Sequence, residues 1–337
     1  MKKYVKMAFV IFMLSNAPYT LAEDNEHHHN HTEHADAPIG VMGEHPHSKD
    51  DWMFTYAYST MKMRNNHNGK DDISTSQVLA DFMVSPTSMT MQMHMFGLMY
   101  GVSEKFMLMG MMPYSLISMD HINRMGAKFT TQSEGIGDLK LSGSYTFYEH
   151  ASQRVLLNFG ISVPVGSIDE RDNTPAGTNQ KLPYPMQLGS GTYDFSPGLT
   201  YTRQIGRWSL GGQAKATIRT GKNDNSYRLG NEYGFTAWGV RKVNHYLNGS
   251  LRVDGKSWGN IEGNDPELNP MMVPTSRTDL RSGKRIDLLL GVNFIAPEGT
   301  LKGNRLGIEI GFPIYQNLNG PQLAVDYRLS AAWQLVF

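Results

Sequence analysis

Methionine and histidine offer the most distinctive chemistry in this chain, and both are unevenly distributed. The sequence has 22 methionines and no cysteine in 337 residues. Methionine thioethers are soft ligands that select Cu(I) and, by chemical likeness, Ag(I). A polar N-terminal segment holds seven of the twelve histidines, namely His27, His28, His29, His31, His34, His45 and His47. Because imidazole suits Cu(II) or zinc, this segment is a candidate metal site of its own.

The methionines recur at a spacing of two along neighbouring segments. The residues that share this spacing are Met89, Met91, Met93, Met95 and Met99 in one segment and Met107, Met109 and Met111 in the next. A spacing of two places side chains on one face of a strand, and adjacent strands lie about 4.8 Å apart. Two or three thioethers could therefore surround one ion. His67, His94 and His121 lie near this pair, although His94 falls on the face opposite the methionines.

The methionine row has a second interpretation, because methionine is also an adaptable apolar filler. If the row faced lipid, it would be only an apolar surface. The face opposite Met89–Met99 is polar at Thr90–His94 and apolar at Phe96–Tyr100, so this strand leaves the orientation open. Phe106 and Leu108 lie opposite the row on the next strand and favour methionines that point inward. The histidine segment likewise has the alternative of a solvated linker.

The N-terminus has the pattern of a secretory signal peptide. Lys2, Lys3 and Lys6 precede a short apolar stretch, and a small-residue region ends at Ala22. We therefore expect cleavage after residue 22 and export through the Sec pathway. A buried N-terminal helix of a soluble protein is the alternative. Residues 23–51 show no strand pattern, and we expect them to form a disordered, histidine-rich periplasmic arm.

Residues 52–337 predict one all-β domain, a transmembrane antiparallel β-barrel of about twelve strands (10–14). Aromatic and β-branched segments of strand length alternate with Gly-, Asn-, Asp- and Pro-rich segments. Short turns and longer loops alternate, which is typical of outer-membrane barrels with tight periplasmic turns. The expected strands are 52–64, 87–102, 105–120, 137–148, 153–166, 191–204, 207–220, 229–243, 246–258, 284–296, 304–316 and 323–337.

The last strand has the two-residue period of a barrel wall. Tyr327, Leu329, Ala331, Trp333, Leu335 and Phe337 form an apolar face, whereas the alternate positions are mostly polar. The terminal Phe337 resembles the signal that the barrel assembly machinery reads. We therefore expect a location in the outer membrane of a Gram-negative bacterium, with outer-membrane lipid and that machinery as partners.

Charge and composition exclude several other classes of protein. The 31 basic and 31 acidic residues balance, which argues against a nucleic-acid partner. The absence of cysteine excludes disulfides, a thiolate zinc site and a cysteine nucleophile. Most strand charges should point into the lumen, because charge on the lipid face is costly. This group comprises Arg203, Arg219, Arg241, Arg252, Arg281, Arg285, Arg328, Lys215, Asp254, Asp287 and Asp326. Trp52, Trp208, Trp258 and Trp333 fit aromatic girdles.

Several segments resemble a known family of outer-membrane barrels, named after the MetA protein of phenol-degradation pathways. The matching segments are Ala35–His45, Trp52–Phe54, Met89–Met95, Gly135–Leu139, Val163–Gly166 and Asn317–Pro321. The resemblance extends over nearly the whole mature chain. It implies a barrel and outer-membrane transport, and it brings no catalytic residues.

Three functions compete. The first is a channel or transporter for a small solute, with a link to copper or another soft metal. The second is an outer-membrane protein that sequesters metal without transport. The third, a lipid hydrolase, is disfavoured because the chain lacks the Gly-x-Ser-x-Gly pattern around Ser190 or elsewhere. We therefore expect no enzyme, and no cofactor beyond a Cu(I), Cu(II) or similar soft-metal ion.

Overall fold

The computed structural model describes residues 37–41 and 49–337, and it confirms the predicted all-β barrel. The expected signal peptide (1–22), most of the expected arm (23–51) and its seven histidines lie outside the described residues. The wall consists of β1 (Trp52–Gly69), β3 (Val84–Ser103), β4 (Phe106–Asn123), β6 (Leu139–His150), β7 (Gln153–Val163), β11 (Gly198–Ile205), β12 (Trp208–Arg219), β14 (Glu232–Lys242), β15 (Leu247–Trp258), β17 (Gly283–Ile295) and β18 (Asn304–Val336).

The sheet closes on itself through antiparallel pairs. Pairing of β12 with β14 joins the two ends of the strand order, so every wall strand has a neighbour on both sides. Strand β18 counts twice, because its first half pairs with β17 and its second half with β1. The eleven labelled wall strands thus supply the twelve expected wall segments. Closure satisfies backbone groups that lipid cannot, which is why barrels can span membranes.

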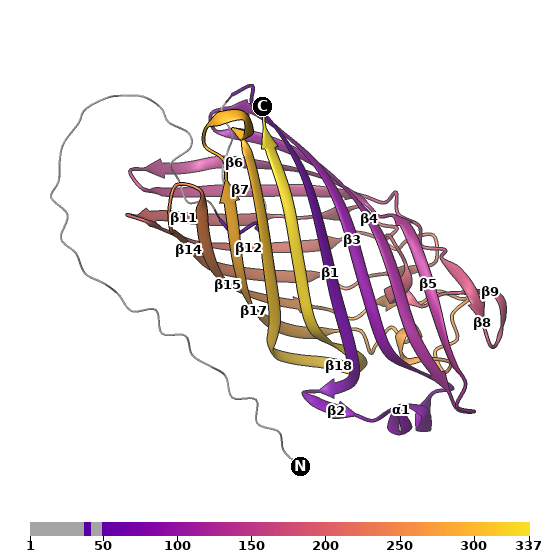
Figure 1. The fold of residues 1–337 in the computed structure, drawn as a ribbon. Coiled ribbons are helices and arrows are strands. Elements are labelled where there is room, and N and C mark those ends of the chain that lie inside the picture. The colour runs from indigo at the N-terminus through magenta and orange to yellow at the C-terminus, as the bar shows by residue number, and fades with distance from the viewer. Residues whose placement is uncertain (1–36, 42–48) are drawn as a thin grey trace, which may run out of the picture. The chain divides into compact units, whose positions relative to one another are not determined.

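The two ends of the barrel differ as the sequence predicts (Figure 1). At one end, two residues join β3 to β4, β6 to β7 and β11 to β12. The backbones of Trp52 and Phe337 exchange hydrogen bonds of 3.0 and 2.9 Å at this same end. The other end carries the long connections. We assign the end with the short turns to the periplasm, because outer-membrane barrels have this asymmetry.

The long connections contain more regular structure than expected. They include β2 (Asp71–Ile73), α1 (Thr75–Asp81), β5 (Lys128–Ile136), β8 (Arg171–Thr174), β9 (Gly177–Lys181), η1 (Tyr184–Met186), β10 (Asp194–Phe195), β13 (Tyr227–Arg228), β16 (Glu262–Gly263) and η2 (Pro274–Ser276), whereas η3 (Gly299–Leu301) lies in a connection at the periplasmic end. The gap predicted at 121–136 is wrong in its second half, because β5 extends the hairpin with β4. The predicted loop 317–322 is also absent, since β18 turns without a break. Among the described residues, no helix has the length and apolar character needed to cross a membrane.

The outward face of the wall is apolar. Leu290, Ile308 and Phe312 expose half or more of their surface, and similar residues recur at every second position of β17 and β18. Their alternates, Leu289 and Glu309, are buried inside the barrel. The wall therefore presents its apolar side chains to lipid and turns the alternate set toward the lumen.

Candidate functional site: a lumen with two unlike walls

Alternation of burial shows that the methionine row faces the lumen. On β3, Met89 and Met99 are 3% and 2% exposed, whereas Phe96 and Leu98 on the other face are 48% and 45% exposed. Strand β4 follows the same rule, with Met107 buried beside the exposed Leu108. The orientation that the sequence left open is thus inward, as Phe106 and Leu108 favoured.

The methionines form a continuous surface over three adjacent strands. Register aligns Met63, Met89 and Met119 in one row across β1, β3 and β4, and Met53, Met99 and Met109 in another. We call the inward methionines of these strands the methionine wall. It consists of Met53, Met61, Met63, Met89, Met91, Met93, Met95, Met99, Met107, Met109, Met111 and Met119.

Four members of this wall were not predicted from the sequence. Met53, Met61, Met63 and Met119 were not among the candidate ligands, although the first three share the two-residue period of β1. Met112 is the one methionine of the wall strands that lies on the outer face, where it pairs with Phe96. A methionine used only as packing has no reason to be confined to one face of three neighbouring strands.

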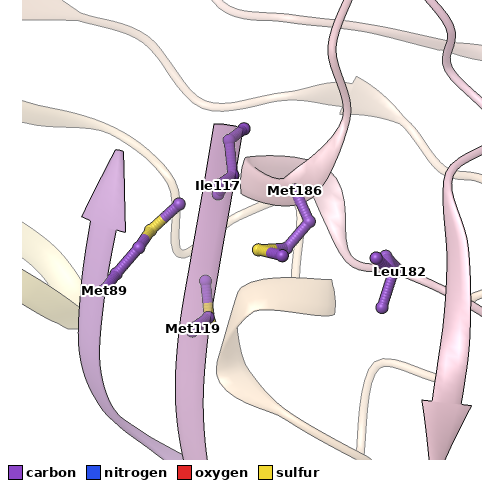
Figure 2. Packing of buried hydrophobic residues seen from close by; sticks show 5 residues of the cluster. All are labelled: Met89, Ile117, Met119, Leu182 and Met186. Atoms are coloured by element: carbon purple, nitrogen blue, oxygen red, sulfur yellow. The ribbon is translucent and has the colours of Figure 1, made fainter. Parts of the chain in front are cut away.

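A long loop folds inward against the methionine wall. Leu182 and Met186, which are 1% and 0% exposed, pack in one cluster with Met89, Ile117 and Met119. Figure 2 shows the Met186 side chain extending from the loop toward the strands that carry Met89 and Met119. The loop (167–190) therefore narrows the lumen from the extracellular side. The sequence of this loop has no periodicity from which its inward position could be predicted.

The two ends of this loop are tied together by one carboxylate. Asp138 accepts hydrogen bonds from the Gly166 and Ser190 backbone amides, at 3.1 and 2.8 Å, and from Ser190 Oγ at 2.8 Å. A Cβ on Gly189 would lie 2.3 Å from the carbonyl oxygen of Gly166, so the backbones at the two ends of the loop are in direct contact. The Gly135–Leu139 and Val163–Gly166 motifs thus form a structural anchor. Ser190 Oγ lies within hydrogen-bond distance of two carboxylates, at 2.8 Å from Asp138 and 3.1 Å from Asp194.

The wall opposite the methionines is charged. Arg252 on β15 donates to Glu309 on β18 through Nε at 2.8 Å and Nη2 at 2.5 Å. Arg328 Nη1 lies 2.9 Å from carboxylate oxygens of both Asp254 and Asp287. Bidentate and shared ion pairs of this kind hold arginine side chains in fixed positions. We call β12, β14, β15, β17 and β18 the charged wall.

The expected inward direction holds for most strand charges, with three exceptions. Arg203 and Arg241 lie on the outer face near the periplasmic turns, where Arg241 stacks on Trp208 with 5.5 Å to the ring centroid. Asp326 pairs with the exposed Arg64 near the extracellular end. Strand ends lie at the membrane interface, where charge costs little.

The predicted aromatic girdle holds for Trp52 and Trp208, which face outward. Trp258 does not belong to it, because its side chain faces inward and donates to the Arg281 carbonyl at 2.7 Å.

Residues 37–41 enter the barrel, although we expected this stretch to be part of the disordered arm. Ala37 and Val41 pack against Trp238 and Val240 on β14, and the Ala37 carbonyl accepts from Arg305. A Cβ on Gly40 would lie 2.5 Å from both Arg252 Nη2 and Glu309 Oε2. We call residues 37–41 the plug segment. It occupies the lumen near the periplasmic end, against the charged wall.

The remaining histidine candidates are scattered. His94 points outward and accepts from or donates to Tyr56 Oη at 2.8 Å, whereas His67 pairs with Asp72 at 2.7 Å. His121 faces inward and is 4% exposed. Within residues 37–41 and 49–337, no three His, Asp or Glu side chains are placed to hold a metal ion together. The metal candidates that the structure does bring together are therefore the thioethers.

The closed wall, its apolar outer face and its charged interior define an outer-membrane β-barrel with the fold of a channel. The chain belongs to the family described as "Putative MetA-pathway of phenol degradation", which matches residues 74–265, more than half of its length. This confirms the resemblance found in the sequence.

A comparison with solved structures finds the same barrel fold in an outer-membrane channel. The COG4313 outer membrane channel from Pseudomonas putida F1 superposes with a TM-score of 0.64 at 13% identity, over 89% of this chain and 100% of that one. The transport unit of the autotransporter AIDA-I from Escherichia coli gives 0.48 at 11% identity, over 89% and 94%. A comparison with curated proteins gives no match.

Proposed function

We propose that the protein is a passive channel of the outer membrane, and that a small solute moves between the methionine wall and the charged wall. The observation that carries this proposal is the unlike character of the two walls. Twelve thioethers line one side, and arginine and lysine side chains project from the other. A lumen of this kind suits a solute with one apolar side and one charged group.

The positive side chains that line the lumen favour a negative group on that solute. Lys140 and Lys215 point into the lumen and form no ion pair with any described residue, so they add positive charge beyond the paired arginines. Thioethers make favourable contacts with aromatic rings, of about 0.3–1.5 kcal/mol each. The family description names phenol degradation, which involves aromatic compounds. We therefore propose small aromatic acids, of which benzoate is the simplest probe.

Two inward segments restrict the size of the solute. The plug segment narrows the periplasmic half of the lumen, and the loop with Leu182 and Met186 narrows the extracellular half. A path bordered by both leaves room for small molecules rather than oligomers. Export by the Sec pathway, periplasmic placement of the arm and recognition of Phe337 by the assembly machinery belong to the same proposal.

Conductance of the purified full-length protein in planar bilayers tests the proposal. With a KCl gradient, the reversal potential should show a preference for chloride over potassium. Benzoate should reduce the chloride current more than acetate does at equal concentration, because only benzoate can contact the methionine wall through a ring. A barrel without conductance or benzoate flux into liposomes would refute the channel function.

The second candidate is a link to copper or another soft metal, either as a transported ion or by sequestration without transport. The confinement of the methionines to the lumen favours it, because thioethers are soft ligands. Titration with Cu(I) against a competing chelator tests this candidate. If replacement of Met91, Met93, Met107 and Met109 by leucine leaves Cu(I) binding unchanged, the methionine ladder does not bind metal. Deletion of residues 23–36, combined with His45→Ala and His47→Ala, removes all seven histidines of the arm and tests it separately.

A further inference from the structure

We infer that Met89, Met119 and Met186, with His121, form a discrete site for one soft monovalent ion, Cu(I) or Ag(I), which joins the inward loop to the barrel wall. The inference deepens the soft-metal candidate of the proposed function and rests on it. The ion would bind at a single site at the extracellular end of the methionine wall, rather than at many equivalent methionines along it.

Convergence of thioethers from separate elements is the first observation. Met89 comes from β3, Met119 from β4 and Met186 from η1, and all three pack in one buried cluster. Their exposed fractions are 3%, 1% and 0%. Figure 2 shows Met186 directed from the loop toward the two strands. Met63, which shares the row of Met89 and Met119, packs on the edge of the cluster.

The second observation is the buried imidazole of His121 on the inner face of β4. His121 follows Met119 by two residues on β4, so both side chains lie on the inner face. Its side chain is buried, and Nδ1 has no hydrogen-bond partner among the described residues. The ring stacks on Phe129 with centroids 4.9 Å apart. A buried nitrogen without a partner is costly in a protein interior, and a metal ion would satisfy it.

The chemistry of these groups selects the ion. Thioether and imidazole are neutral ligands, and the neighbours in the cluster, Ile117 and Leu182, are apolar. The nearest carboxylate in sequence, Asp120, lies on the other face, where it accepts from Ser88 at 2.6 Å and Thr130 at 2.8 Å. A site without carboxylates cannot compensate a divalent hard cation, whereas sulfur ligands favour Cu(I) and its analogue Ag(I).

Binding at this site has a structural consequence. Met186 belongs to the loop, whereas Met89, Met119 and His121 belong to the wall. An ion that binds the folded arrangement stabilises it relative to one in which the loop has moved away. We therefore expect the ion to hold the loop in its inward position, and to reduce conductance through the extracellular half of the lumen.

Titration of the full-length protein with Ag(I) in chloride-free nitrate buffer tests the site. The wild type should bind one ion more tightly than any other, and Met186→Leu, Met119→Leu and His121→Leu should each weaken that step at least tenfold. Met112→Leu, on the same strand but on the lipid face, and Met125→Leu, in an exposed turn, are matched controls and should not change it. The heat-dependent mobility of each variant on SDS gels verifies that the barrel has folded.

Proteolysis of the loop and conductance provide the second readout. Ag(I) should slow thermolysin cleavage within residues 167–190 and lower conductance in the wild type, but not in Met186→Leu. Tight Ag(I) binding that survives in all three site variants would overturn the site, as would equal loss in Met112→Leu. A barrel that conducts but binds no Ag(I) refutes this site and leaves the channel intact. A barrel that binds Ag(I) without conducting refutes the channel instead.

Discussion

Nη1 of Arg285 on β17 lies 3.7 Å from the sulfur of Met61 on β1. The two halves of β18 lie between these strands in the wall. Both side chains must therefore extend across the inner surface to meet. The contact marks one seam between the charged wall and the methionine wall. It also shows why the lumen is best described as two surfaces rather than as a uniform polar pore.

Accessibility of single cysteines should distinguish the two faces of β3 and β4. The chain has no native cysteine, so a substitution introduces the sole reactive thiol. Met93→Cys should react with a charged, water-soluble thiosulfonate and lower the conductance, because its side chain faces the lumen. Met112→Cys should stay unlabelled in the membrane. The reverse pattern would show that the methionine row faces lipid.

Breaking the Arg252–Glu309 pair should destabilise the barrel strongly. These side chains are 3% and 1% exposed, so removal of one partner leaves an uncompensated buried charge. Such a change costs about 3–5 kcal/mol. Glu309→Ala should therefore lower the denaturant midpoint in detergent much more than Arg252→Met combined with Glu309→Met. Equal losses in the single and double variants would contradict this account.

Displacement of the plug segment should open the periplasmic half of the lumen. A side chain at Gly40 would overlap Arg252 and Glu309, so Gly40→Val should expel the segment and raise the conductance. Gly249→Ala on β15 is the matched control, because a Cβ there meets no atom within 4 Å. Conductance that stays at the wild-type value in Gly40→Val would mean that the plug segment does not restrict the path.

The fold could be predicted from the sequence because the membrane imposes a simple rule on each strand. Strands such as β17 alternate between lipid and lumen, and their lengths and turn residues are local properties. The plug segment and the loop around Met186 follow no such rule. Their positions depend on contacts with residues far along the chain, such as Arg305 with Ala37 and Met119 with Met186. The row Met63–Met89–Met119 likewise required the strand register, which spacing within one strand cannot supply.

Loss of the Asp138 carboxylate should free the inward loop without opening the wall. Asp138→Ala removes the acceptor for Gly166 and for both donors of Ser190, which flank the loop on either side. Thermolysin should then cut within 167–190 faster than in the wild type, while the folded mobility on SDS gels stays unchanged. Asp138→Asn, which keeps one acceptor oxygen, should fall between the two. An unchanged cleavage rate in Asp138→Ala would show that other contacts hold the loop.

The same loop should respond to acid through Asp169. Hydrogen bonds from Lys181 and from Asn225 lower the pKa of the Asp169 carboxyl below its usual value. Lys181, itself buried, also lies 3.2 Å from Asp265 in a second loop. Because the pKa in the folded state is lowered, the ionised carboxylate stabilises the folded loop above the ordinary aspartate pKa of about 4. That contribution disappears as the pH falls through the lowered value.

Acid should therefore loosen the loop in the range below about pH 4 and have little effect between pH 5 and 7. Conductance and its fluctuations, recorded from pH 7 to pH 3, should rise at the acidic end in the wild type. Asp169→Asn cannot ionise, so its loop should already be looser at neutral pH, and its acid response should be smaller. Other carboxylates also titrate in this range, and the difference between the two proteins isolates Asp169. Identical pH profiles would exclude the Asp169–Lys181 contact as a determinant of loop position.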